Sequence, residues 1–260
     1  MPINQKKLIV ANWKMNPTVL REAVALASGI VKALPRSHRA DIVIAPPTPY
    51  LASLKKIFIG KRISLGAQNM HFENEGAHTG EVSGKMLRSL DVKYVILGHS
   101  ERRADGETDQ IINMKLKAAL KNGLTPIVCV GEESRDQAHQ YLGVLQAQIL
   151  ATFATIPAAS LAKITIAYEP VWAVGVTASR EATPEESTEM VIFIRRVLAD
   201  VFGAKAVEGL HFLYGGSVNP KNARDFLERG GVDGLLVGRD SLRKDTFSRI
   251  IKATTPNETN

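Results

Sequence analysis

Short apolar runs and longer amphipathic stretches alternate along the whole 260-residue chain. Most of the runs are continuous and rich in Val, Ile and Leu, as strands buried on both faces of a sheet should be. They lie at about residues 7–12, 42–46, 63–67, 92–97, 125–130, 164–168, 210–214 and 233–237. Strands that alternate with helices in this way predict parallel pairing and a closed α/β barrel of the (β/α)8 type.

Several stretches between the runs carry the start and stop signals of helices. Apolar residues recur with helical spacing from Glu107 to Lys121, and Asn122-Gly123 follows as a stop signal. Thr183 is placed to cap a second helix that begins at Pro184. Asn219-Pro220 should begin a short third helix. These signals support the regular alternation of strand and helix.

The spacing of the runs favours a single domain. An open doubly wound sheet is the alternative, but no Gly-x-Gly-x-x-Gly motif follows an early run, which weakens it. The chain contains no long linker and no low-complexity segment, so residues 1–260 are expected to form one barrel domain. The polar residues 254–260 are expected to form a frayed tail.

Composition and charge narrow the class of protein. The 45% hydrophobic and 23% charged residues are typical of a soluble globular protein, and no apolar stretch approaches the length of a membrane span. The first run ends too early for a signal peptide, and the single cysteine, Cys129, allows no intramolecular disulfide. A cytoplasmic location is therefore expected. The net charge of +7 is dispersed, which favours an anionic substrate over a nucleic acid partner.

Polar and glycine residues follow most of the runs at the point where each strand should end. In a parallel barrel these ends converge on one mouth, so we expect them to surround one small molecule. In chain order they are Asn12, Lys14, Gln68, Asn69, His99, Glu132, Glu169, Gly215-Gly216-Ser217 and Gly238-Arg239.

These residue types favour proton transfer on an anionic substrate. A carboxylate and an imidazole that face one small molecule can move a proton between neighbouring carbon and oxygen atoms. An amine can stabilise an oxyanion, and the glycine-rich ends after the last two runs can offer backbone N–H groups to a phosphate. Taken alone, Glu169 could equally be a strand-end carboxylate in an ion pair, and a lysine such as Lys14 is most often solvated.

Six motifs, in this order and at this spacing, resemble those of triosephosphate isomerases. They are Ala11-Asn12-Trp13-Lys14-Met15-Asn16, Gly66-Ala67-Gln68-Asn69, Gly98-His99-Ser100-Glu101-Arg102-Arg103, Cys129-Val130-Gly131-Glu132, Ala167-Tyr168-Glu169-Pro170-Val171-Trp172-Ala173 and Tyr214-Gly215-Gly216-Ser217-Val218-Asn219. The similarity runs from about residue 7 to residue 250. It implies a TIM barrel that interconverts dihydroxyacetone phosphate and D-glyceraldehyde 3-phosphate through an enediolate, in glycolysis and gluconeogenesis, without a cofactor or a metal.

The resemblance also implies a role for each site residue. Glu169 would take the proton from the carbon next to the carbonyl. His99, at the start of a helix, would be a neutral electrophile and proton shuttle. Lys14 and Asn12 would bind the substrate oxygens and the developing negative charge. Glu101 would pair with Lys14 or His99, or would be a carboxylate stabilised by the helix N-terminus.

The phosphate-binding segments depart from the family pattern. The groups implied to bind phosphate belong to Gly175, Ser217, Gly238 and Arg239. The lid tip, residues 175–182, is longer than usual, and Arg239 stands where the family usually has the second glycine of a pair. The Arg239 side chain could add charge near the phosphate, but we expect it to point into solvent or to pair with Asp240.

A long polar loop follows the third run, from Gln68 to Glu81. In the family the corresponding loop enters a neighbouring subunit, where Thr79 would approach the partner subunit's Asn12 and Lys14. A homodimer is therefore expected. The alternative is an ordinary surface loop, and some relatives are tetramers.

Two functions of other kinds compete with this interpretation. A sister isomerase acting on a four-carbon ketose phosphate would make use of the longer lid and Arg239. A non-catalytic phosphate-binding barrel is the other. The set of Asn12, Lys14, His99 and Glu169 argues against it, because binding alone has no use for a base opposite an electrophile.

Overall fold

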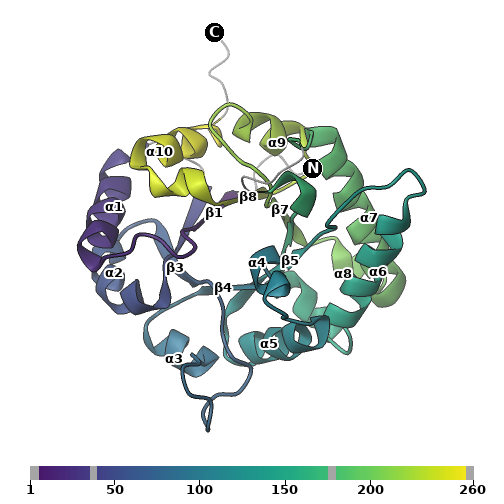
Figure 1. Ribbon diagram of the computed structural model, residues 1–260, viewed down its shortest axis with the longest axis horizontal. Coiled ribbons are helices and arrows are strands. Elements are labelled where there is room, and N and C mark those ends of the chain that lie inside the picture. Colours follow the sequence, from purple (N-terminus) through teal and green to yellow (C-terminus); the bar gives the residue numbers. More distant parts are fainter. Residues whose placement is uncertain (1–5, 36–39, 175–179, 256–260) are drawn as a thin grey trace.

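The continuous Val, Ile and Leu runs form a closed parallel barrel in the computed structural model, which describes residues 6–35, 40–174 and 180–255 (Figure 1). Each strand pairs with the next, and β8 pairs with β1. The strands are β1 (Lys7–Asn12), β2 (Ala40–Ala45), β3 (Ile63–Ala67), β4 (Tyr94–Leu97), β5 (Thr125–Val130), β6 (Thr165–Tyr168), β7 (His211–Tyr214) and β8 (Gly234–Val237). The predicted (β/α)8 fold is confirmed.

Helices surround the barrel and cover the outer face of the strands (Figure 1). The α-helices are α1 (Leu20–Ala33), α2 (Leu51–Phe58), α3 (Gly84–Ser89), α4 (Ser100–Ala104), α5 (Asp109–Lys121), α6 (Gln140–Thr152), α7 (Pro184–Phe202), α8 (Ala204–Val207), α9 (Ala223–Arg229) and α10 (Lys244–Lys252). Short 3-10 helices are η1 (Thr48–Tyr50), η2 (Ala158–Lys163), η3 (Val171–Ala173) and η4 (Arg239–Leu242).

The strands divide their side chains between two cores. In β1, Leu8 and Val10 belong to the cluster that fills the barrel, whereas Ile9 belongs to the cluster between strands and helices. This alternation follows from the two-residue period of a strand. Cys129 lies in the barrel cluster, and burial raises the pKa of its thiol well above the usual range, with the Glu169 carboxylate as the next cause. It packs there as a small buried apolar residue.

Local capping chemistry accounts for where several helices begin. Thr183 accepts a hydrogen bond from the Glu186 N–H, and the Glu186 carboxylate accepts one from the Thr183 N–H. This capping box confirms the predicted start of α7 at Pro184. The short helix predicted after Asn219-Pro220 is present as α9, which begins at Ala223 after a turn in which Asn219 Oδ1 accepts from the Lys221 and Asn222 N–H groups.

Two strands begin two residues away from the predicted start. Strand β2 runs from Ala40 to Ala45 rather than over 42–46, because Pro46 has no N–H for the ladder. Strand β4 begins at Tyr94 rather than at residue 92. The Val92 N–H is bonded to the Leu87 carbonyl in the turn after α3, so it cannot join the sheet.

The last described residues of the chain continue the final helix. The Thr254 and Thr255 N–H groups bond to the carbonyls of Ile251 and Lys252, which continues the last turn of α10. Residues 256–260 lie outside the described part.

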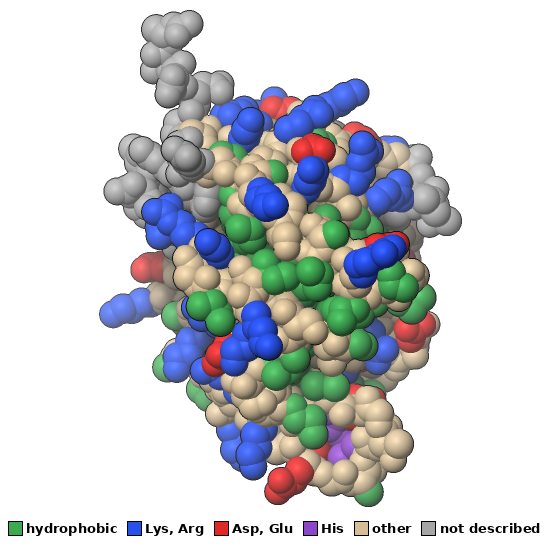
Figure 2. Space-filling model, turned by 90° about the vertical axis from the view of Figure 1, so that its left-hand side faces the viewer, with side chains coloured by type: hydrophobic (Ala, Val, Ile, Leu, Met, Phe, Trp, Pro, Cys, Tyr) green, Lys and Arg blue, Asp and Glu red, His purple; other side chains and the backbone are tan. Residues whose placement is uncertain are grey.

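Surface charge on the side of the molecule that carries α1 and α2 is dispersed. Lys and Arg side chains are scattered over this face and do not form one block (Figure 2). Within the three described ranges, no helix combines the length and apolar character that crossing a membrane requires.

Candidate active site at the carboxyl ends of the strands

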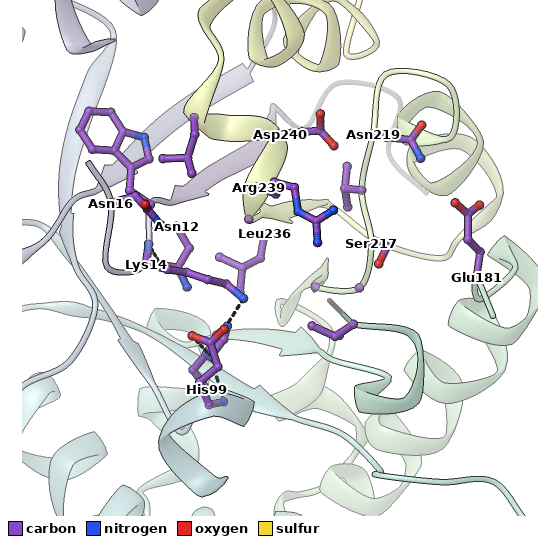
Figure 3. A pocket seen from close by; sticks show the side chains of 18 of the residues that line it. Asn12, Lys14, Asn16, His99, Glu181, Ser217, Asn219, Leu236, Arg239 and Asp240 are labelled. Atoms are coloured by element: carbon purple, nitrogen blue, oxygen red, sulfur yellow. Dashed lines mark hydrogen bonds and ion pairs between the residues drawn. The ribbon is translucent and has the colours of Figure 1, made fainter. Parts of the chain in front are cut away.

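A cavity of about 650 Å³ opens at the carboxyl ends of the strands (Figure 3). The sequence-predicted residues that line it are Asn12, Lys14, His99, Glu101, Gly215, Gly216, Ser217, Gly238 and Arg239. They come from β1, β4, β7 and β8 or the residues just after these strands. The predicted convergence on one mouth is confirmed for this set.

Gln68 and Asn69 were expected at the mouth but do not line the cavity. Gln68 Nε2 donates to the backbone carbonyls of Lys14 and Ala45, each at 2.8 Å. Asn69 Oδ1 accepts from Lys115 Nζ at 2.8 Å. Both amides therefore turn away from the cavity and hold neighbouring segments in place, because they find fixed partners there.

Glu132 also does not line the cavity, contrary to expectation. Its Oε1 accepts from Tyr168 Oη at 2.8 Å, from Trp172 Nε1 at 2.9 Å and from Arg135 Nε at 3.0 Å. The Arg135 guanidinium lies 5.3 Å from the Trp172 ring centre. Burial raises the pKa of Tyr168 above its usual range, so its hydroxyl stays a donor. Glu132 thus anchors the segment on both sides of Glu169.

Glu169 follows β6 and is 2% exposed. Its Oε2 accepts a hydrogen bond from the Ser100 N–H at 2.9 Å, at the start of α4. Its Oε1 lies 3.4 Å from His99 Nε2 and has no hydrogen-bond partner among the described residues. The carboxylate therefore lies beside the cavity rather than in its lining. Gly215 leaves room for it, since a Cβ there would lie 2.8 Å from Glu169 Cγ.

His99 is the N-cap residue of α4, and its side chain is 9% exposed. The Glu101 N–H donates to His99 Nδ1 at 3.2 Å. Because Nδ1 accepts, the proton of a neutral ring sits on Nε2, on the side of Glu169. The arrangement presents an N–H donor to a ligand next to a carboxylate.

Lys14 extends into the cavity and is held at both ends (Figure 3). Its Nζ contacts Glu101 Oε1 at 2.5 Å, so the expected pairing of Glu101 is confirmed, and Glu101 Oε2 lies 3.8 Å from His99 Nδ1. Its backbone has a φ of 52°, in the left-handed region that is uncommon for lysine. Asn12 Oδ1 accepts from the Lys14 N–H at 3.0 Å and stabilises this conformation.

Backbone N–H groups without partners lie at the ends of β7 and β8. Within the described ranges, these groups of Gly216, Ser217, Gly238 and Arg239 donate no hydrogen bond, although all four residues line the cavity. Ser217 Oγ donates to the Ala173 carbonyl at 2.7 Å and joins β7 to the segment after Glu169. Free N–H groups that face a cavity can bind an anion. Gly175, the other expected contributor, lies outside the described residues.

Comparisons with known proteins point to one family. The family model for triosephosphate isomerase matches residues 7–254. The triosephosphate isomerase of Carboxydothermus hydrogenoformans is 44% identical over 252 residues, which cover 96% of this chain and 99% of that protein. Those of Rhodopirellula baltica and Alkaliphilus oremlandii are 42% and 39% identical, over 96% and 95% of this chain and 98% and 99% of theirs.

The chain belongs to the triosephosphate isomerase family. The predicted enzyme class is confirmed with it: the chain is an isomerase. The strand-end motifs identified in the sequence all lie inside the matched range.

The observed position of the Arg239 side chain differs from our expectation. Its side chain points into the cavity, whereas the Asp240 carboxylate points away from it (Figure 3). The chain turns at Gly238, with φ −86° and ψ −111°, directly into η4. This turn directs the first side chain of η4 toward the mouth rather than toward solvent or Asp240.

Three contributions to this site escaped the sequence prediction. The Ser100 N–H binds Glu169, Arg135 supports Glu132, and Arg180 lies 4.4 Å from the Trp172 ring centre. The helix-start pattern at residues 100–103 could have indicated the first. Both arginines lie close in the chain to these partners, Arg135 three residues after Glu132 and Arg180 eight residues after Trp172, but neither belongs to the strand-end set from which the site was predicted. In the described part of the chain, no group of three or more His, Cys, Asp or Glu side chains is placed to hold a metal ion.

Proposed function

We propose that this isomerase interconverts dihydroxyacetone phosphate and D-glyceraldehyde 3-phosphate, with Glu169 as the base and His99 as the electrophile. The observation that carries this assignment is the pair itself. Glu169 Oε1, which lacks a hydrogen bond, lies 3.4 Å from the His99 Nε2 at the edge of the cavity. A buried carboxylate oxygen with no donor is costly for stability and is available for chemistry.

Proton transfer follows from these positions. The Glu169 carboxylate turns from the Ser100 N–H toward the cavity and takes a proton from the carbon next to the substrate carbonyl. The C–H electron pair forms the carbon–carbon double bond of an enediolate, and negative charge moves to the carbonyl oxygen. His99 Nε2–H donates to that oxygen and the imidazole moves a proton between the two oxygens. The protonated Glu169 then returns its proton to the neighbouring carbon.

Lys14 and Asn12 stabilise the charge that develops. The Lys14 ammonium lies in the cavity, where it donates to the Glu101 carboxylate, and Asn12 accepts from the Lys14 backbone N–H. A fixed cation near the enediolate oxygen lowers the transition state because it needs no reorganisation during the reaction. Lys14 also attracts the anionic substrate.

The phosphate is held by the free backbone N–H groups of Gly216, Ser217, Gly238 and Arg239. Its position at the ends of β7 and β8 is the usual place for a phosphate in this fold. Gly175 would add a further N–H from outside the described part. No cofactor and no metal takes part in this proposal, because the carboxylate, imidazole and ammonium supply each proton and charge.

A side-by-side substrate assay tests this function. We expect kcat/KM for glyceraldehyde 3-phosphate to exceed that for erythrulose phosphates by about 10- to 200-fold, the discrimination that one extra carbon unit allows. Equal values would favour the four-carbon isomerase. Phosphate binding without turnover of either sugar would indicate the non-catalytic barrel.

The protein acts as a cytoplasmic homodimer in this proposal. The loop from Gln68 to Glu81 is irregular, and Thr79 at its tip is exposed. A long exposed loop on a barrel is suited to enter a second copy of the chain. The buried Cys129 is the only cysteine and is consistent with a reducing compartment.

Replacing Thr79 by Arg tests the dimer. A charged side chain at the loop tip should raise the dimer dissociation constant by at least about 10-fold and lower activity in parallel, because a buried charge without a partner is costly. Analytical ultracentrifugation and turnover measured over a dilution series give both quantities. Ala159→Arg, at an exposed position of η2, is the matched control and should change neither. A fully active monomer would contradict the proposal.

A further inference from the structure

Arg239 presents a guanidinium to the cavity at the place where the phosphate is expected. It is the first residue of η4, directly after Gly238, and its side chain points into the cavity (Figure 3). Its own backbone N–H is one of the free groups at the end of β8. The side chain and the N–H groups therefore belong to one region of the wall.

Arg239 differs from the other cationic side chains in the described lining, which are Lys14 and Arg180. Lys14 is neutralised by Glu101. Arg180 makes two contacts with the Glu186 carboxylate, at 2.9 and 2.5 Å, and lies over Trp172. The Arg239 side chain makes no hydrogen bond and no ion pair in the described part of the chain. It is therefore the cation of this lining whose charge is left for a ligand.

The carboxylates of the lining do not compete for Arg239. Asp240 points away from the cavity, Glu181 lies across it, and Glu101 is paired with Lys14 (Figure 3). The Lys14 side chain passes close to Gly238, since a Cβ on that glycine would lie 3.5 Å from Lys14 Cε. An anion at the end of β8 would thus meet a guanidinium, free N–H groups and, nearby, an ammonium. A planar guanidinium can donate two parallel hydrogen bonds to phosphate oxygens.

We propose that the Arg239 side chain is a direct ligand of the substrate's phosphate group and sets the affinity of the site for phosphate dianions. This inference rests on the proposed isomerase function. The Arg239 side chain adds a contact to those of the backbone N–H groups. It makes the enzyme more sensitive to competing inorganic phosphate than a glycine at this position would. Arg239 acts on binding and takes no part in the proton transfer.

Arg239→Gln, Arg239→Lys and the control Arg243→Gln test the proposal. Arg243 is also exposed and lies nearby in the chain but does not line the cavity, so the control removes an equal charge. Binding of inorganic phosphate is measured by titration calorimetry, which needs no turnover. The inhibition constant for inorganic phosphate, KM and kcat are measured for glyceraldehyde 3-phosphate at fixed ionic strength.

For Arg239→Gln we expect the dissociation and inhibition constants for inorganic phosphate, and KM, to rise by about 5- to 10-fold, the range for a charge-assisted contact that is partly exposed. The loss should appear in KM more than in kcat, and Arg239→Lys should recover part of it. Arg243→Gln should match the wild type. Constants for Arg239→Gln within twofold of the wild type, or an equal loss in Arg243→Gln, would overturn the inference.

The same measurements separate this inference from the proposed function. A wild-type protein that binds inorganic phosphate but turns over no triose phosphate would contradict the isomerase assignment. If the protein turns over triose phosphate but its phosphate binding does not depend on Arg239, only the proposed role of the side chain is contradicted.

Discussion

The Glu169→Asp variant is expected to fold normally. Its turnover number should be at least about 100-fold lower than that of the wild type, because a shift of the base by about 1 Å has an effect of this size. The shorter side chain keeps the charge and the acidity of a carboxylate. It withdraws the carboxylate by one methylene group, so the oxygen no longer reaches the substrate carbon. The variant therefore tests position rather than chemistry.

The surroundings of Glu169 make this effect specific. Its carboxylate is bound by the Ser100 N–H on one side and faces His99 on the other. Gly215 provides the space into which the side chain can turn. The Glu169→Gln variant keeps the length and removes the base, and it should lose about 100- to 10,000-fold, the usual contribution of general base catalysis.

Turnover is measured in both directions, from glyceraldehyde 3-phosphate and from dihydroxyacetone phosphate. Circular dichroism and sedimentation check that the variants are folded. Glu185→Asp is the matched control, since Glu185 is exposed in the first turn of α7 and pairs with Arg229 at 3.6 Å. It should keep the wild-type rate. If folded Glu169→Asp retained turnover within about fivefold of the wild type, where misplacement predicts about 100-fold, Glu169 would not be the base.

The Lys115→Met variant is expected to lower the free energy of unfolding by about 3–5 kcal/mol. This is the cost of removing one partner of a buried ion pair and leaving the other charge unpaired. Lys115 Nζ contacts Glu107 Oε1, and the two side chains are only 5% and 2% exposed. Glu107 Oε2 has no hydrogen-bond partner among the described residues. Without the ammonium, the Glu107 carboxylate would be buried with no compensating charge. Lys115 also donates to Asn69, at the start of the loop that carries Thr79.

Urea unfolding at a fixed protein concentration measures the change. The double variant Glu107→Gln/Lys115→Met should lose less than Lys115→Met alone, because it removes both charges. Lys85→Met is the control: Lys85 and Glu75 are 3.9 Å apart and 71% and 84% exposed, so the change should stay within about 0.5 kcal/mol. A loss in Lys115→Met no larger than in Lys85→Met would mean that the buried pair does not stabilise the fold.

Much of the fold could be predicted because its signals are local. Continuous apolar runs place the strands, and capping residues such as Thr183 place the helices. Errors arose where a local signal had a competing local use. Val92, for example, ends the turn after α3 instead of beginning β4.

The site could be predicted in part for a topological reason. Parallel strands in a barrel end at the same face, so residues that follow them must come together whatever their distance in the chain. His99 and Glu169 meet in this way after β4 and β6. Gln68, Asn69 and Glu132 follow strands as well, but each side chain bonds to neighbours outside the cavity.

The sequence by itself determined the alternation of strands and helices, the closed barrel and the set of strand-end residues that suit proton transfer on a phosphorylated sugar. Only the tertiary structure decided that the Glu169 carboxylate is bound by the Ser100 N–H and that Arg239 points into the cavity without a partner. The physical reason is that side-chain direction depends on the local backbone turn and on partners far away in the chain. Neither quantity can be obtained from the identity of the residue alone.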